Sequence, residues 1–158
     1  MTRQREYLCY TDGSCKTSDG SPGGWGFVLK SAGLAALEGY GSAQPTLAKV
    51  MEYQAVAEAL SALPKGVRAV VFSDDRALVE NLTRNLGNWR RTNFANVDPL
   101  IGESARRIAG AIADKELVVR FQWLRSHNGN AGNERADALA AQGAREAKAA
   151  LPARPSKR

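Results

Sequence analysis

Four acidic residues lie in four separate stretches of the chain where burial is expected. Asp12 closes the apolar run of YLCYTDGSC, and Asp74 ends the strand-like RAVVFSDD. Glu52 falls within the apolar stripe of VMEYQAVAEAL, and Asp137 lies early in the helix-like GNERADALAAQGA. Burying several carboxylates together is very costly unless cations accompany them, and Mg²⁺ prefers carboxylate oxygens. If the four residues converge, the sequence predicts a metal-dependent site for phosphoryl transfer.

Helical periodicity separates Glu52 from its neighbour Glu58. We expect a helix over residues 47–63. At about 100° per residue, Glu52 projects roughly 40° from Val56 on the apolar face, whereas Glu58 points toward solvent. A carboxylate on the apolar face costs stability unless something binds it, which favours a functional role. A buried, hydrogen-bonded structural glutamate is the alternative.

The other three carboxylates each have a structural alternative. Asp12 and Asp74 are expected at the carboxyl ends of strands, the usual place for ligands in open α/β sheets. Asp74 can also be read as a helix N-cap, but Asp75 follows it directly and can do that capping. Asp137 is expected in the second turn of its helix and is ambiguous when taken alone. It lies beside a face of small residues that lets the helix approach the sheet, formed by Ala140, Ala141 and Ala144.

The sequence contains one histidine and two cysteines. His127 lies in LRSHNGNAGNER, a polar loop, where a role in proton handling or phosphate contact competes with an ordinary surface position. Cys9 and Cys15 do not have the spacing of a metal site and are expected to be reduced intracellular thiols.

Length and charge indicate one domain with a basic end. The 158 residues carry a formal charge of +6, of which +4 falls within residues 145–158. We expect a catalytic domain over 1–149 and a basic, disordered tail over 150–158, because that tail contains two prolines and no aromatic residue. No stretch predicts a signal peptide or a membrane span, so a cytoplasmic protein that binds no membrane is expected.

The pattern of apolar residues predicts a mixed sheet with helices on both faces. An antiparallel meander opens the chain, and a continuous apolar run marks a later central strand. The strands are expected at 5–11, 25–30, 34–41, 67–72 and 116–124, with a tight turn between the second and third. The helices are expected at 47–63, 76–86, 97–113 and 131–149, with a short separate segment at 88–94.

Taken together, these motifs resemble type 1 ribonuclease H over roughly residues 5–145. The matching motifs are TDGSC followed by GGWG, ME before an alanine-rich helix, a strand ending in SD, NW followed by basic residues, NVD, and H-x-G followed by NERAD. Each is weak alone, but their shared order is highly specific. The resemblance implies the ribonuclease H-like α/β fold and endonucleolytic hydrolysis of the RNA strand of RNA–DNA hybrids. It further implies 5'-phosphate and 3'-hydroxyl ends, and a monomer without an obligatory protein partner.

The resemblance also implies roles for the acidic residues and the histidine. Asp12 is expected to bridge two Mg²⁺ ions, with Mn²⁺ as a possible substitute. Asp137 is expected to hold the ion that activates water, and Glu52 and Asp74 the ion on the leaving-group side. His127 matches a loop histidine that assists proton transfer or product release.

Two further sets match the family's substrate-binding positions. The first set comprises Gly13, Ser14 and Cys15, which are expected to meet the 2'-hydroxyls of the RNA, together with Thr46 and Asn133. The second is a substrate handle in which an indole packs on a sugar and cations meet DNA phosphates, and it comprises Asn88, Trp89, Arg90 and Arg91. A core role that closes a helix pair is the alternative for Trp89.

Several positions depart from the family pattern. The stretch Thr46-Leu47-Ala48-Lys49 replaces residues that help grip the substrate, and Asp75 replaces a serine beside the metal ligands. The basic protrusion is shortened between Phe94 and Asn96, which predicts weaker substrate binding. Two alternatives accompany the leading hypothesis. The intact TDGSC, GGWG and NW-basic motifs argue against a DNA-directed enzyme of the same fold, and the presence of all four carboxylates argues against a non-catalytic hybrid-binding domain.

Overall fold

The computed structural model describes residues 4–15, 21–125 and 129–150. The order of elements alternates between strands and helices after an opening run of three strands. In chain order they are β1 (Glu6–Cys15), β2 (Ser21–Lys30), β3 (Leu37–Thr46), α1 (Ala48–Ala62), β4 (Arg68–Ser73), α2 (Arg76–Arg91), α3 (Gly102–Asp114), β5 (Val118–Trp123) and α4 (Ala131–Ala149).

The strands form one five-stranded sheet in the order β3-β2-β1-β4-β5. The pairs β1–β2 and β2–β3 are antiparallel, whereas β1–β4 and β4–β5 are parallel. The predicted mixed sheet, with its antiparallel meander and parallel strands, is therefore confirmed. Parallel pairing places the carboxyl ends of β1, β4 and β5 at one edge of the sheet, where ligand sites of such folds lie.

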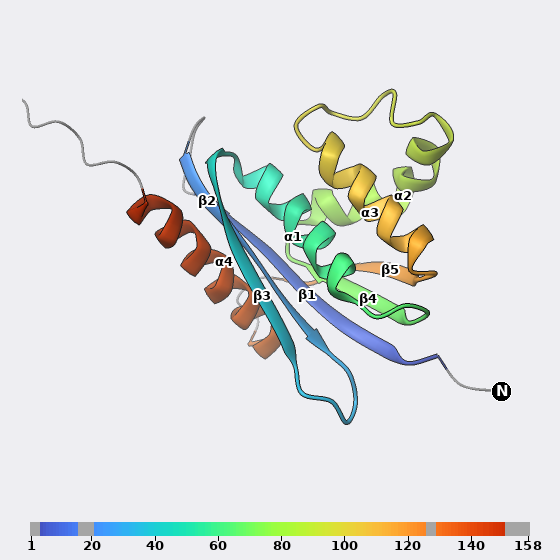
Figure 1. Ribbon diagram of the computed structural model, residues 1–158, viewed down its shortest axis with the longest axis horizontal. Helices are drawn as coiled ribbons and strands as arrows, with labels where there is room; N and C mark the ends of the chain where they lie inside the picture. The colour runs from blue at the N-terminus through green and yellow to red at the C-terminus, as the bar shows by residue number, and fades with distance from the viewer. Residues whose placement is uncertain (1–3, 16–20, 126–128, 151–158) are drawn as a thin grey trace, which may run out of the picture.

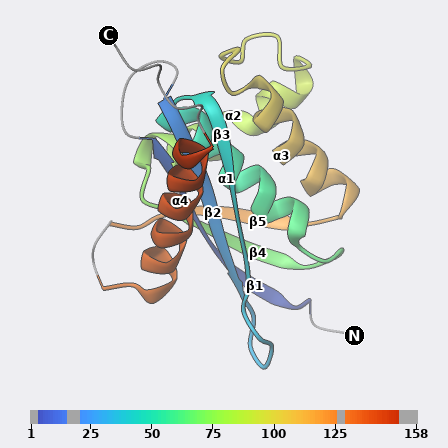
Figure 2. The same ribbon diagram turned by 60° about the vertical axis from the view of Figure 1, so that its left-hand side comes forward.

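Helices cover the two faces of the sheet unequally. Figures 1 and 2 show α4 alone on one face, over β1 to β3, and the other three helices on the opposite face. The main hydrophobic core lies between the sheet and these three helices, and it includes Leu29, Leu60 and Ile108, each at most 1% exposed. A smaller apolar cluster under α4 contains Val28 and Leu139. Burial on this scale provides the main stabilisation of the fold.

Small residues allow α4 to lie very close to the sheet. A Cβ atom added to Gly24 would come within 2.4 Å of the Ala140 carbonyl oxygen and the Ala144 nitrogen, and one added to Gly143 would meet the Gly41 carbonyl oxygen at 2.1 Å. A larger side chain at these positions would therefore push the helix away from the sheet. The predicted small face of α4 serves this close approach, and α4 carries Asp137 on the same helix.

The boundaries of several elements differ from the sequence expectations. β1 extends to Cys15 and β2 begins at Ser21, because the glycines and serines predicted to form a loop pair across the antiparallel ladder. The β2–β3 connection spans 31–36 and is longer than the tight turn expected. α2 continues to Arg91, into the stretch 88–94 predicted as a separate segment, because Trp89 extends the buried stripe of that helix. α3 begins at Gly102, since Asp98 accepts from the Leu100 N–H in a turn that precedes the helix.

Two further predictions concerned membrane spans and the C-terminal tail. None of the helices in the described residues is long and apolar enough to cross a membrane. The predicted tail lies outside the described residues from 151 onward.

Candidate active site

Asp12 lies where β1 separates from β4. The parallel ladder between these strands ends at the Tyr10–Phe72 pair, and Thr11 Oγ1 closes it by donating to the Phe72 carbonyl at 3.2 Å. β1 continues past this point, paired with β2 alone, so Asp12 is in the middle of a strand and not at its end as predicted. Asp74 directly follows the last residue of β4. The fork between the two strands thus brings both carboxylates to one place.

Glu52 reaches this fork because α1 lies against β1 at Gly13. A Cβ atom added to Gly13 would lie 2.5 Å from the Glu52 backbone nitrogen, so only glycine allows this approach. The Gly13 N–H donates to Glu52 Oε1, which fixes one side of the carboxylate. The expectation that Glu52 faces the sheet is confirmed, because it is 8% exposed while Glu58 is less buried and pairs with Arg107 at 2.9 Å.

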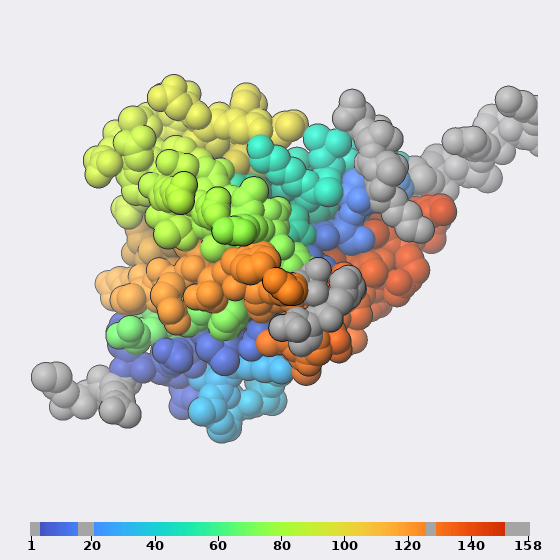
Figure 3. Space-filling model, turned by 180° about the vertical axis from the view of Figure 1, so that it is seen from behind, coloured from blue at the N-terminus to red at the C-terminus, as the bar shows by residue number. Residues whose placement is uncertain are grey.

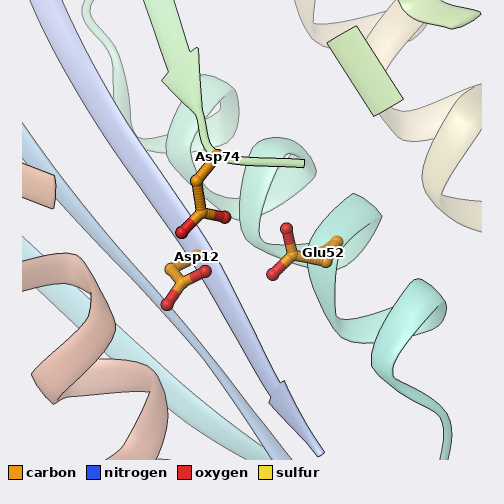
Figure 4. Close-up of side chains that lie close together, drawn as sticks. All are labelled: Asp12, Glu52 and Asp74. Atoms are coloured by element: carbon orange, nitrogen blue, oxygen red, sulfur yellow. The ribbon is translucent and has the colours of Figure 1, made fainter. Parts of the chain in front are cut away.

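The three carboxylates form a compact cluster. One oxygen from each of Asp12, Glu52 and Asp74 lies within 4.8 Å of the others, and Figure 4 shows the side chains pointing toward one another from β1, α1 and the end of β4. Asp137 stands outside this three-residue set and is exposed, but its carboxyl lies within hydrogen-bonding reach of Asp12. Three of the four predicted residues therefore converge fully, and the fourth approaches from α4.

Burial and mutual repulsion oppose ionisation of this cluster. The pKa of Asp12 is raised strongly, first by burial and then by the negative charge of Glu52, with contributions from Asp137 and Asp74. The pKa of Glu52 is also raised, mainly by burial, although hydrogen bonds from Asp12 and the Gly13 N–H partly offset that effect. When no cation is bound, burial and repulsion therefore favour the retention of protons by the cluster.

The donor set fits a divalent cation. Glu52 Oε2 is buried and has no hydrogen-bond partner among the residues that the structure describes. An unpartnered buried carboxylate oxygen is costly in a folded protein, and a hard cation removes that cost. Asp12, 5% exposed, and Asp74 present further carboxylate oxygens beside it. The arrangement can bind Mg²⁺ or Mn²⁺ through oxygen ligands alone.

Asp75 has a structural role that leaves Asp74 available. The Asp75 side chain accepts from the Leu78 N–H at 3.0 Å and caps α2, as predicted. Trp123 Nε1 donates to the Asp74 carbonyl oxygen at 3.2 Å from the end of β5. Asp74 is thus anchored through its backbone next to a capped helix, and its carboxylate turns toward Asp12.

Comparison with known proteins identifies the relatives of this chain. The ribonuclease H family model matches residues 4–145. A ribonuclease H from Polaromonas sp. is 34% identical over 149 residues, which cover 92% of each chain. A ribonuclease H from Bordetella bronchiseptica is 37% identical over 143 residues, with 88% of this chain and 89% of that protein covered.

The chain belongs to the ribonuclease H family.

As a ribonuclease H family member, the protein is a nuclease of the hydrolase class. Solved structures share its fold. LC9-RNase H1 superposes with a TM-score of 0.77 at 23% identity, over 93% of this chain and 75% of that chain. LC11-RNase H1, solved in complex with an RNA/DNA hybrid, gives a TM-score of 0.67 at 21% identity, over 90% of this chain and 99% of that chain. At these identities the likeness shows the fold alone.

The predicted handle of this ribonuclease H family member combines buried and exposed residues. Residues 88–91 form the end of α2, where Arg90 and Arg91 are exposed. Trp89 is only 8% exposed and belongs to the main hydrophobic core. Its position matches the core alternative, so Asn88 and the two cations are the part of the handle that faces solvent.

The other predicted substrate-binding residues come from three elements. Gly13, Ser14 and Cys15 complete β1, and Thr46 ends β3. Cys15 Sγ donates to the Thr46 carbonyl oxygen at 3.5 Å, which links the two strands. Asn133 is in the first turn of α4 and is 4% exposed. His127 lies outside the described residues.

A groove between α1 and α2 adds residues that the sequence reasoning missed. It encloses about 580 Å³, and Glu52 and Asp75 line it at the carboxylate cluster. Asn81, Arg84 and Asn85 line it from α2. Their spacing of three and four residues places them on one helix face, which is a signal present in the sequence. In the space-filling view of Figure 3, β1 (blue) reaches the surface between α1 (blue-green) and α4 (red), beside this helix pair.

Proposed function

We propose that this enzyme is an endonuclease that cleaves the RNA strand of RNA–DNA hybrids with two divalent metal ions, leaving 5'-phosphate and 3'-hydroxyl ends. The observation that carries this proposal is the cluster of Asp12, Glu52 and Asp74, with the buried, unpartnered Glu52 Oε2, in a chain of the ribonuclease H family. The hybrid complex of LC11-RNase H1 supports the substrate class.

The residues that would hold the metal ions are the three clustered carboxylates and Asp137. Asp12 is the one residue of the cluster whose pKa is influenced by all three of the others, Glu52, Asp137 and Asp74. It would therefore be the ligand that two ions could share. When bound, divalent cations would neutralise charge on the attacking and departing oxygens of an in-line displacement.

The backbone and the core elements would hold the carboxylate ligands in place before a cation binds. Glu52 Oε1 is already engaged by the Gly13 N–H, so Oε2 is the oxygen left for a cation. Because the pKa values of Asp12 and Glu52 are raised, metal binding at neutral pH must release protons from the cluster. The ligands come from two strands and a helix of the core, which limits their motion when the substrate arrives.

Substrate recognition would divide between the two strands of the hybrid. The end of β1, with Gly13, Ser14 and Cys15, lies next to the carboxylates and would meet the 2'-hydroxyls of the RNA. Arg90 and Arg91 at the end of α2 are exposed and would contact phosphates of the DNA. His127, which precedes α4 in the sequence, is proposed to assist proton transfer or product release.

The decisive experiment compares four substrates with one enzyme preparation. A labelled RNA–DNA hybrid, single-stranded RNA, double-stranded RNA and double-stranded DNA are incubated with Mg²⁺, Mn²⁺ or EDTA. Cleavage of the hybrid's RNA alone, with either cation and not in EDTA, is expected. Cleavage of double-stranded DNA would instead support the DNA-directed alternative, and binding of the hybrid without cleavage would contradict catalysis.

The products and the oligomeric state provide further tests. The 3' ends of the RNA fragments should be extended by a polymerase without prior phosphatase treatment, and their 5' ends should be degraded by an exonuclease that requires 5'-phosphate. We further propose that residues 1–149 form the catalytic unit and act as a cytoplasmic monomer. Light scattering on the purified protein, with and without hybrid, measures the oligomeric state.

A further inference from the structure

A second groove runs along α4, away from the carboxylate cluster. It encloses about 810 Å³, and Ser14 from β1 and Pro22 from β2 form one wall. The other wall is the second half of α4, where Ala141 and Ala144 contribute small side chains. Ser14 is two residues beyond Asp12 on the same strand, so the groove begins next to the candidate active site.

The α4 wall of the groove lies on the helix face that carries Asp137. At about 100° per residue, Ala144 and Lys148 project within roughly 20° of the direction of Asp137, and Arg145 within about 80°. At about 1.5 Å per residue, Arg145 and Lys148 lie roughly 12 and 16 Å along the helix from Asp137. The groove therefore continues the active site in one direction along α4.

The described residues that line this groove carry only positive charge. Arg145 and Lys148 line it and are exposed, and neither forms an ion pair with any residue that the structure describes. The groove between α1 and α2 differs, because Glu52, Asp75 and Glu80 line it together with its cations. The sugar-phosphate backbone of a nucleic acid fits this groove, because the small side chains of the α4 wall leave room for the sugars and the two cations attract the phosphates.

We infer that the groove along α4 holds the RNA strand of the hybrid on one side of the cleavage point, with Arg145 and Lys148 contacting its phosphates. This inference rests on the proposed function. The strand that is cut must pass the carboxylates, and this groove leads directly away from them. With about 3.4 Å of duplex axis per phosphate of one strand, the two cations lie roughly three to five nucleotides from the cleaved bond.

The test compares Arg145→Ala/Lys148→Ala with a matched control, Lys65→Ala/Arg68→Ala. The control removes the same two charge types near the turn between α1 and β4, at the opposite end of the parallel strands. On a long hybrid, the α4 variant should raise KM about three- to tenfold, leave kcat unchanged, and flatten the log–log salt dependence by up to about two. The control should match the wild type.

Mapping the cleaved positions shows which strand occupies the groove. The α4 variant should lose cleavage efficiency at interior positions but not at positions within about three nucleotides of one RNA end, where no RNA reaches the cations. Shortening the DNA strand instead should leave the difference between variant and wild type unchanged. Equal KM values for variant and wild type, or a difference that follows the DNA end, would overturn the inference while leaving the proposed function intact. Absence of hybrid cleavage by the wild type would overturn the proposed function itself.

Discussion

The acidic cluster of this enzyme is buried, whereas the basic residues proposed to contact nucleic acid are exposed. Asp12 and Glu52 are at most 8% exposed, come from different elements, and leave one buried oxygen without a partner. The cations proposed to contact nucleic acid, such as Arg90 and Lys148, are exposed at the ends of helices. The acidic site reduces stability until a cation binds, whereas the basic residues have little effect on the folded state.

This difference predicts two kinds of response to mutation. Removing a buried ligand changes both catalysis and the stability of the free protein, because the electrostatic cost of the cluster is built into the fold. Removing an exposed cation changes substrate affinity in a graded and salt-dependent manner. The predictions below proceed from the largest expected effect to the smallest.

Asp12→Asn should reduce hybrid cleavage at least about a thousandfold, since a shared metal ligand is lost. The same change replaces a buried carboxyl, whose ionisation the fold opposes, with a neutral amide, so the free energy of unfolding without metal should stay equal or rise. Steady-state kinetics and urea denaturation in EDTA measure the two effects. Asp114→Asn, at an exposed position at the end of α3, is the control and should change neither. Near-normal cleavage by the Asp12 variant would contradict the assignment of the site.

The stability of the metal-free protein should fall as pH rises through neutrality. The folded-state pKa values of Asp12 and Glu52 are raised above their unfolded values near 4, so the folded chain binds more protons than the unfolded chain above that pH. Stability is therefore lost progressively between the unfolded and the folded pKa of each group, by up to about 1.4 kcal/mol per pH unit for each proton retained only in the fold.

Saturating Mg²⁺ should flatten this pH dependence, because the cation compensates the ionised carboxylates and binds only the folded chain. Urea denaturation between about pH 5 and 8, in EDTA and in Mg²⁺, measures the slope. The Asp12→Asn variant should show a smaller slope in EDTA. A free energy of unfolding that rises with pH in EDTA would show that the fold does not raise the pKa values of Asp12 and Glu52.

Replacing both handle arginines, Arg90→Ala/Arg91→Ala, should raise KM several-fold and leave kcat close to that of the wild type. The two cations are exposed, whereas Trp89 packs in the core. The log–log salt dependence of KM should flatten by up to about two. Kinetics across a salt series, beside Lys65→Ala/Arg68→Ala, separate a specific contact from a general loss of charge. A large fall in kcat would place the arginines nearer to the chemistry than the structure does.

The sequence was sufficient to predict those site residues that are charged but interrupt or end an apolar pattern. Glu52 on an apolar helix face and Asp74 at the end of an apolar strand were both identifiable, because each is a charge where burial is expected. The capping role of Asp75 was also identifiable from its place before α2. These inferences need only local periodicity and the cost of burying charge.

Features that depend on tertiary contacts were not accessible in the same way. The contact between the Gly13 N–H and Glu52 joins residues 39 positions apart, and local pattern does not reveal it. The extension of β1 to Cys15 depends on pairing with the glycines of β2, whose local preference is for turns. The burial of Trp89 follows from the continuation of α2, which the Leu82-to-Trp89 spacing of seven residues would have indicated had the helix been extended.

The smallest effect on activity is expected at Asp75, which lies beside the cluster but points its carboxylate at the backbone of α2. Asp75→Ala removes the hydrogen bond to the Leu78 N–H and should cost about 1 kcal/mol of stability, whereas Asp75→Asn keeps a capping oxygen and should cost much less. Both variants should retain kcat within about twofold at saturating Mg²⁺, because the charge of Asp75 acts on Glu52 only as a minor contribution to its raised pKa. Urea denaturation and cleavage kinetics on the two variants give separate readings of capping and charge. If Asp75→Asn lost activity as fully as Asp12→Asn while keeping its stability, Asp75 would belong to the metal-binding set. The distinction between buried metal ligands and the residues beside them would then not hold for Asp75.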